Sequence, residues 1–136
     1  MISLPTRFPH ILSPDVPVLI RWLTKHMTEI LWIDMDVRVG EGRPAPPETP
    51  PNLRQMALDL SKRRIDVVAG FPNYIAIVEV TGLAGFTAIG QLLVYPPLYR
   101  QTFSPGLEVI PLLVCSEIQP DVKSVIGDYG IKYEIV

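Results

Sequence analysis

Two adjoining hydrophobic segments constrain the fold of this chain most strongly. Residues 64–70 and 74–81 are rich in β-branched and other apolar side chains, and only Phe71-Pro72-Asn73 separates them. Short apolar runs bounded by turn residues predict strands, and the three-residue connection predicts an antiparallel hairpin. Because nearly every position is apolar, both faces of this hairpin need a cover. We expect the hairpin at the centre of a sheet that has helices on both sides.

The remaining segments supply those helices and further strands. Helical spacing of apolar residues predicts helices at 15–28, 53–60, 84–95 and 119–130, and residues 30–39, 107–116 and 131–136 read as strands. In strand 30–39 the apolar residues alternate and share one face. We expect Asn52 to cap the second helix, Gly82 to end the second hairpin strand, and Pro96-Pro97 to stop or restart the third helix.

This order of elements predicts one α/β domain of three layers that spans residues 1–136. A central mixed sheet is flanked by helices, and the core elements run α-β-β-β-α-β-α-β along the chain. A length of 136 residues is that of one ordinary domain.

A proline-rich loop at residues 40–52 interrupts this pattern with five prolines. Proline has no amide hydrogen and clashes with a preceding helical turn, so the segment should be an exposed, semi-rigid loop. Long loops in small domains are often functional. The prolines can serve as an extended docking segment for a protein partner, or they can simply stiffen the loop.

Composition indicates an intracellular protein. No apolar run is long enough to span a membrane, and no signal peptide is recognisable. The single cysteine, Cys115, excludes an internal disulfide and is expected to behave as a small buried hydrophobe. We therefore predict a cytoplasmic protein that does not interact with membranes. Its small size suggests a viral or mobile-element origin.

Asp66 and Glu79 are the only charged residues inside the apolar cores of the two hairpin strands. Ionised carboxylates cost several kcal/mol to bury unless they are paired or bind a cation. The hairpin places Asp66 opposite the region of residues 77–79, so the two side chains can meet on one face. Two carboxylates this close repel unless a cation such as Mg²⁺ or Mn²⁺ lies between them. Alternatively, the pair forms a structural salt-bridge network with Arg63 and Arg64.

The pattern of Asp66, a short gap and Glu79-Val80-Thr81 resembles the PD-(D/E)XK nuclease superfamily, whose signature is Asp followed by Glu-X-Lys. The order of elements resembles that superfamily's core over nearly the whole chain. Gln91 and Tyr95 are similar to the Gln-xxx-Tyr motif of its RecB-like and Cas4-like branch, and a resolvase-like branch is the alternative. The resemblance implies a restriction-endonuclease-like fold, a Mg or Mn cofactor held by Asp66, Glu79 and the Val80 carbonyl, and a catalytic set that includes Thr81, Gln91 and Tyr95.

The chain departs from the family pattern at Thr81, where the signature has its lysine. A threonine hydroxyl can orient a water molecule but cannot neutralise negative charge. Lys62 or Arg64 on the neighbouring strand can supply a relocated cation.

Two further acidic or histidine pairs are candidate metal ligands. His26 and Glu29 lie near the end of the first helix at i, i+3 spacing and resemble weakly an extra ligand of some branches. A histidine there is more commonly an exposed partner of the helix dipole. Asp34 and Asp36 share one strand face, and on an edge strand such charges usually face solvent.

A run of basic residues predicts phosphate contacts, although the formal net charge of the chain is −2. The candidate nucleic-acid-binding residues are Arg38, Arg43, Arg54, Lys62, Arg63 and Arg64. An ordinary solvated face is the alternative interpretation.

Two functions follow from the sequence. The first is a metal-dependent DNA nuclease that hydrolyses phosphodiesters, or a derivative of one. The second is a catalytically inactive domain of the same fold that binds nucleic acid or a protein. DNA is the expected partner, and the excess of apolar residues is consistent with a homodimer.

Overall fold

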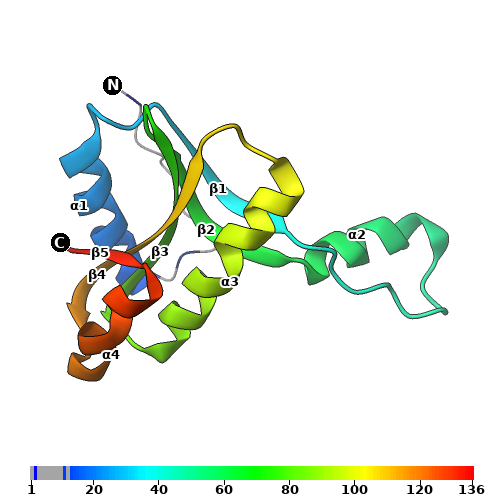
Figure 1. Ribbon diagram of the computed structural model, residues 1–136. Coiled ribbons are helices and arrows are strands. Elements are labelled where there is room, and N and C mark those ends of the chain that lie inside the picture. The colour runs from blue at the N-terminus through cyan, green and yellow to red at the C-terminus, as the bar shows by residue number, and fades with distance from the viewer. Residues whose placement is uncertain (1, 3–10, 12) are drawn as a thin grey trace.

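A five-stranded mixed sheet organises the computed structural model, which describes residues 2, 11 and 13–136 (Figure 1). The strands lie in sequence order: β1 (Trp32–Val39), β2 (Arg63–Gly70), β3 (Tyr74–Ala84), β4 (Glu108–Ile118) and β5 (Lys132–Ile135). β1, β2 and β3 pair antiparallel, whereas β3, β4 and β5 pair parallel. The predicted single α/β domain with a mixed sheet is confirmed.

Helices cover both faces of this sheet. On one face lies α1 (Val16–His26), which follows a 3₁₀ turn at Ser13–Asp15, and on the other lies α3 (Phe86–Phe103). α4 (Pro120–Val125), with a following 3₁₀ turn at Ile126–Tyr129, packs beside α3. Among the described residues, no helix is long and apolar enough to cross a membrane.

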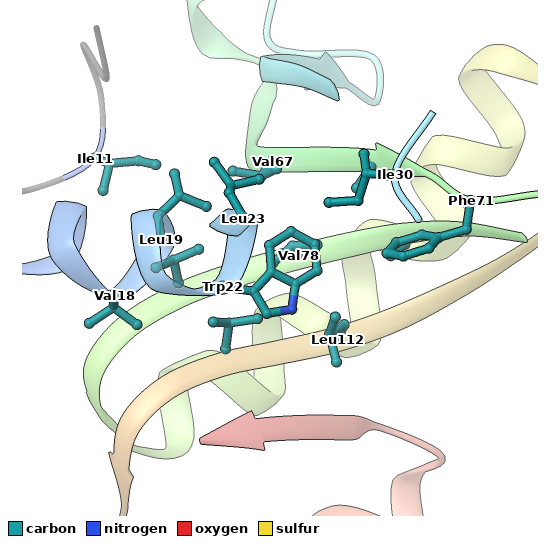
Figure 2. Packing of buried hydrophobic residues seen from close by; sticks show 14 residues of the cluster. Ile11, Val18, Leu19, Trp22, Leu23, Ile30, Val67, Phe71, Val78 and Leu112 are labelled. Carbon is teal, nitrogen blue, oxygen red and sulfur yellow. The ribbon is translucent and has the colours of Figure 1, made fainter. Parts of the chain in front are cut away.

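The core beneath α1 is built around a fully buried tryptophan. Figure 2 shows Trp22 and Leu23 of α1 pointing at Val67 of β2 and Val78 of β3. On the opposite face, the α3 residue Tyr95 packs against the hairpin in a second cluster. The hairpin is therefore buried on both sides, as its continuous hydrophobicity predicts.

The hairpin has the register that the short connection predicts. Val67 pairs with Val78 and Gly70 with Ile75, and the Phe71 amide donates to the Tyr74 carbonyl at 2.9 Å. Val67–Val78 is the last pair of this register, and Asp66 and Glu79 are the next residues on the two strands.

Three predicted boundaries are wrong. Gly82 does not end β3, since β4 pairs with that strand as far as Ala84. Pro96-Pro97 neither stops nor restarts α3, which continues through both prolines to Phe103. Burial of residues on both sides of this pair holds the helix together despite the loss of two amide donors. Asn52 is not a cap, because the helix begins at Pro51, and proline is well suited to that first position.

The predicted single apolar face of β1 is also wrong. Met35 packs with the cluster beneath α1, whereas Val37 packs with the cluster beneath α3. Between them Asp36 has a left-handed backbone, with φ of 55°. The side chains of β2 also switch from one face of the sheet to the other near Asp66, since Ile65 packs in the cluster beneath α3 and Val67 in the cluster beneath α1. The two strands therefore turn together at Asp36 and Asp66.

An arm, defined as residues 40–62, projects away from the sheet (Figure 1). It consists of the proline-rich loop and α2 (Pro51–Ser61), none of whose residues is buried. The Arg54 side chain donates to the carbonyls of Pro47 and Thr49 and so braces the loop. Leu53, Met56 and Leu60 are exposed. The arm therefore makes little contribution to the core.

A matched pair of leucine substitutions tests this division between core and arm. Leu19→Ala empties a fully buried position, and we expect it to lower the free energy of unfolding by about 2–5 kcal/mol. Leu60→Ala alters a side chain that is 62% exposed, and we expect a change of less than ~0.5 kcal/mol. Urea denaturation measures both. A cost at Leu60 that approaches the cost at Leu19 would contradict the view of α2 as an unpacked helix.

Candidate functional site

Asp66 and Glu79 lie side by side on neighbouring central strands. Glu79 is only 5% exposed and is the one charged residue among the buried described residues. Each carboxyl group is close enough to affect the pKa of the other. The hairpin therefore brings together the two residues that the sequence singles out.

Burial raises the pKa of both acids. Burial is the main cause of the rise at Glu79, to about 9, and repulsion by Asp66 adds to it. Burial also raises the pKa of Asp66, although its interaction with Glu79 and the nearby Arg64 oppose the rise. A cation beside the pair would reverse this effect by favouring both ionised forms.

A cavity of about 390 Å³ opens above the acidic pair. It is lined by Ile11, Asp15, Asp66, Glu79, Val80, Thr81, Leu83, Gly85, Thr87, Ala88 and Gln91. Residues from β2, β3, α3 and the turn before α1 therefore surround one space. The cavity contains four of the predicted catalytic residues, and the fifth, Tyr95, lies one helical turn beyond Gln91.

Asp15 is a third carboxylate at this cavity, and the sequence interpretation assigned it only to the start of a helix. One of its oxygens, Oδ1, accepts a hydrogen bond from the Gly82 amide at 2.9 Å. Its charge is close enough to raise the pKa of Asp66. Asp15 is far from Asp66 in sequence, so nothing in the local pattern points to their proximity.

Arg64 and Asp36 flank the acidic pair on the outer side. Arg64 Nε lies 3.9 Å from Asp36 Oδ1, and the Arg64 charge favours ionisation of Asp66 and Glu79. Asp36 is half-buried rather than solvent-facing, whereas Asp34 is exposed as expected. Within the described part of the chain, neither Arg63 nor Arg64 forms an ion pair with the acidic pair. The salt-bridge network expected as the alternative is therefore not formed directly.

Neither candidate for a relocated lysine lines the cavity. Lys62 Nζ forms an ion pair with Asp59 at 3.1 Å on the arm, and Arg64 contacts Asp36 instead. Thr81 does line the cavity, and its hydroxyl donates to the Leu83 carbonyl at 3.4 Å. The described lining therefore contains no lysine or arginine.

Gln91 and Tyr95 connect the acidic pair to α3. Tyr95 is largely buried, and the pKa of its phenol is raised by burial and by the charge of Glu79. A hydrogen bond with the Gln91 side chain opposes that rise. The one-turn spacing therefore makes a direct contact between the two residues.

His26 and Glu29 lie in a different part of the molecule. His26 Nδ1 is 2.9 Å from Glu29 Oε2, and His26 Nε2 is 2.9 Å from Glu134 Oε1 on β5. Trp22 Nε1 also donates to Glu134. The histidine therefore contacts the last strand, and neither His26 nor Glu29 lines the cavity.

The donor set of the cavity fits a hard divalent cation that keeps part of its own hydration shell. Within the described residues, no three His, Cys, Asp or Glu side chains are arranged to hold a metal by themselves. Mg²⁺, however, is commonly bound by one or two carboxylates, with waters and substrate phosphates as the other ligands. Glu79 Oε1 is buried without a hydrogen-bond partner, which a cation would remedy.

The predicted phosphate-binding residues gather around the arm and at the ends of β1 and β2 that carry it. Arg43, Arg54 and Lys62 belong to the arm, and Arg38, Arg63 and Arg64 lie on the adjoining strands. None of these side chains lines the acidic cavity.

Comparison with known proteins supports the fold. No protein-family model matches the sequence, and no curated protein gives a significant sequence match. Among solved structures, the chain is similar to a repair endonuclease from Pyrococcus abyssi, with a TM-score of 0.50 and 12% sequence identity. The similarity covers 96% of this chain and 49% of the endonuclease chain, so this protein spans about half the length of that one.

Stability of the metal-free protein should depend on pH through Glu79. The pKa of Glu79 rises from its ordinary value of 4.5 to about 9 on folding, so the folded state holds a proton that the unfolded chain releases. The contribution of Glu79 to stability is thus complete below pH 4.5 and is lost as the pH rises toward 9. In EDTA, Glu79→Gln should melt above the wild type at pH 8, with a shallower decline between pH 5 and 9. Parallel melting curves of the two proteins would refute a buried, protonated Glu79.

Proposed function

We propose that this chain is a divalent-metal-dependent nuclease that hydrolyses phosphodiester bonds in DNA. The observation that carries the proposal is the adjacent Asp66 and Glu79 carboxyl groups at the base of a cavity. The fold, which is similar to that of a repair endonuclease, supports the proposal without establishing the activity.

The metal would be Mg²⁺ or Mn²⁺, held by Asp66, Glu79 and the Val80 carbonyl. Such an ion supplies an activated water and stabilises charge that develops on the phosphate. Burial of Glu79 keeps competing water away from its oxygens. Asp15 also lines the cavity, and because only its Oδ1 accepts the Gly82 amide, its other oxygen could orient a water molecule there.

The other lining residues position these groups. Thr81 follows Glu79 by two residues in β3 and therefore points to the same side of the sheet, where its hydroxyl can orient the attacking water. Gln91 reaches into the cavity from α3, while its contact with Tyr95 fixes its side chain. Arg64 favours the ionised carboxylates that a metal requires.

One observation favours a second candidate function. The described cavity lining contains no lysine or arginine, so no cationic side chain there can neutralise a pentacovalent phosphate. An acidic cavity without a cationic side chain fits a domain that binds nucleic acid or protein and does not cleave DNA. A homodimer and a protein partner for the proline-rich loop stay predictions, as does a cytoplasmic location.

Metal binding is tested by thermal melting with Mn²⁺ or Mg²⁺, using Glu79→Ala alongside the wild type. A ligand that binds only the folded state stabilises it, by ~2.7 kcal/mol at a hundred times its dissociation constant. We expect the melting temperature of the wild type to rise with metal and that of the variant to stay unchanged. An equal effect of metal on the melting temperatures of the wild type and the variant would mean that Asp66 and Glu79 are not metal ligands.

Thr81→Lys tests whether the missing cation limits catalysis. A lysine at this position would place a positive charge in the cavity, and we expect DNA cleavage with Mn²⁺ to rise by at least ~10-fold. Thr87→Lys is the matched control, because it adds the same charge to the same cavity from α3. An equal gain in both variants, or a gain that persists when Glu79→Gln is added, would argue against a nuclease centre.

A further inference from the structure

The six cations around the arm are not equivalent, because most of them are already held by the protein. Arg38 donates to the carbonyls of Leu60 and Lys62, and Arg54 donates to loop carbonyls. Lys62 pairs with Asp59, and Arg64 pairs with Asp36. These four side chains brace the arm and the strands that carry it, so they are poorly placed to bind a ligand.

The two remaining cations, Arg43 and Arg63, line the same groove at the root of the arm. Across the described residues, neither guanidinium has a hydrogen-bond or ion-pair partner. The groove has a volume of about 560 Å³ and is lined by Val39, Gly40, Glu41, Gly42, Arg43, Ser61, Arg63, Leu98 and Gln101. Two free forked donors that converge on one groove are suited to a phosphate group.

Backbone contacts fix the shape of this groove. The Arg43 amide donates to Ser61 Oγ at 2.5 Å, and the Ser61 hydroxyl is also 2.7 Å from the Leu58 carbonyl. Gly42 has φ of 73°, and a Cβ there would lie 2.7 Å from the Leu58 carbonyl oxygen. The Gly40 amide donates to Thr102 on α3 at 3.3 Å. The loop that carries Arg43 is therefore anchored both to α2 and to α3.

Charge is unevenly distributed between this region and the remainder of the chain. Residues 38–64 contain six of the twelve Lys and Arg residues and three of the fourteen Asp and Glu residues, a net charge of +3. The remainder carries −5. Glu41 in the groove offsets part of this positive charge, but two guanidinium groups still face one carboxylate there, which leaves a net positive charge. A polyanion would therefore approach the root of the arm first.

We propose that Arg43 and Arg63 form a phosphate subsite for the DNA strand that enters the acidic cavity. This inference rests on the proposed function. Gln91 in the cavity and Gln101 in the groove are ten residues apart on α3, which corresponds to ~15 Å along the helix. Neighbouring phosphates on a DNA strand are ~6–7 Å apart, since the ~3.4 Å advance per nucleotide is measured along the duplex axis, so the subsite would hold a phosphate about two or three nucleotides from the scissile bond.

The binding test uses the full chain in EDTA, which makes it independent of metal and of cleavage. Anisotropy of a fluorescein-labelled 12-nucleotide DNA strand and of a 12-base-pair duplex would be measured against salt concentration. We expect Arg43→Gln with Arg63→Gln to weaken duplex binding at least ~10-fold and to reduce the salt slope by roughly two. Both residues are exposed, and an unchanged melting temperature would confirm that the variant folds.

Lys123→Gln with Lys132→Gln is the matched control, since it removes the same charge from α4 and β5. An equal loss of DNA affinity in this control would overturn the subsite in favour of a general charge effect. Unchanged DNA binding by the Arg43 and Arg63 variant would also overturn the subsite. So would a groove that binds inorganic phosphate but does not bind DNA.

The position of the subsite is tested by replacing single DNA phosphates with neutral methylphosphonates. We expect the Arg43 and Arg63 variant to be insensitive to a replacement about two or three nucleotides from the scissile bond, whereas the wild type loses affinity there. Sensitivity of the wild type only at other positions would overturn the proposed path. If the metal-dependent rise in melting temperature is absent but the anisotropy result holds, the nuclease proposal fails while the phosphate subsite stands.

Discussion

The antiparallel register of β2 and β3 is the constraint on which the rest of this structure depends. It places Asp66 and Glu79 beside the Val67–Val78 pair, where Glu79 is buried. Burial on both faces is what makes these carboxylates hard to ionise, and so it makes a cation a favourable companion. Trp22 and its neighbours in α1 cover one face and Tyr95 in α3 covers the other, so the packing that stabilises the fold also sets the chemistry of the site.

The hydrophobic core and the proposed phosphate contacts belong to different parts of the molecule. The hydrophobic clusters lie between the sheet and its helices, whereas the arm buries none of its helix. The arm is instead held in place by the side chains of Arg38 and Arg54, which donate hydrogen bonds to its backbone carbonyls. Because the arm carries little of the stability, its sequence can change at low cost to the core. The acidic cavity cannot change in this way, because its two main carboxyl groups belong to central strands.

Much of the fold and the centre of the site could be predicted, and the errors have physical causes. Asp66 and Glu79 stood out because a single charge within an apolar strand needs compensation. Asp15 was missed as a site residue because its proximity depends on a contact with Gly82 across the molecule. The turn at Asp36 was also missed, since its left-handed backbone breaks an otherwise regular alternation of apolar residues. Local rules for Gly82 and for Pro96-Pro97 failed because pairing with β4 and burial of α3 outweigh them.

The sequence by itself determined the buried hairpin, the order of helices and strands, and the two acids that face one another. These features follow from hydrophobic periodicity and short connections, which act between residues near in the chain. Only the tertiary structure decided that Asp15 joins the acidic cavity, that His26 contacts β5, and that Arg43 and Arg63 remain unengaged among six cations. Such assignments depend on which distant groups come within hydrogen-bond distance, and packing of the whole chain sets those distances.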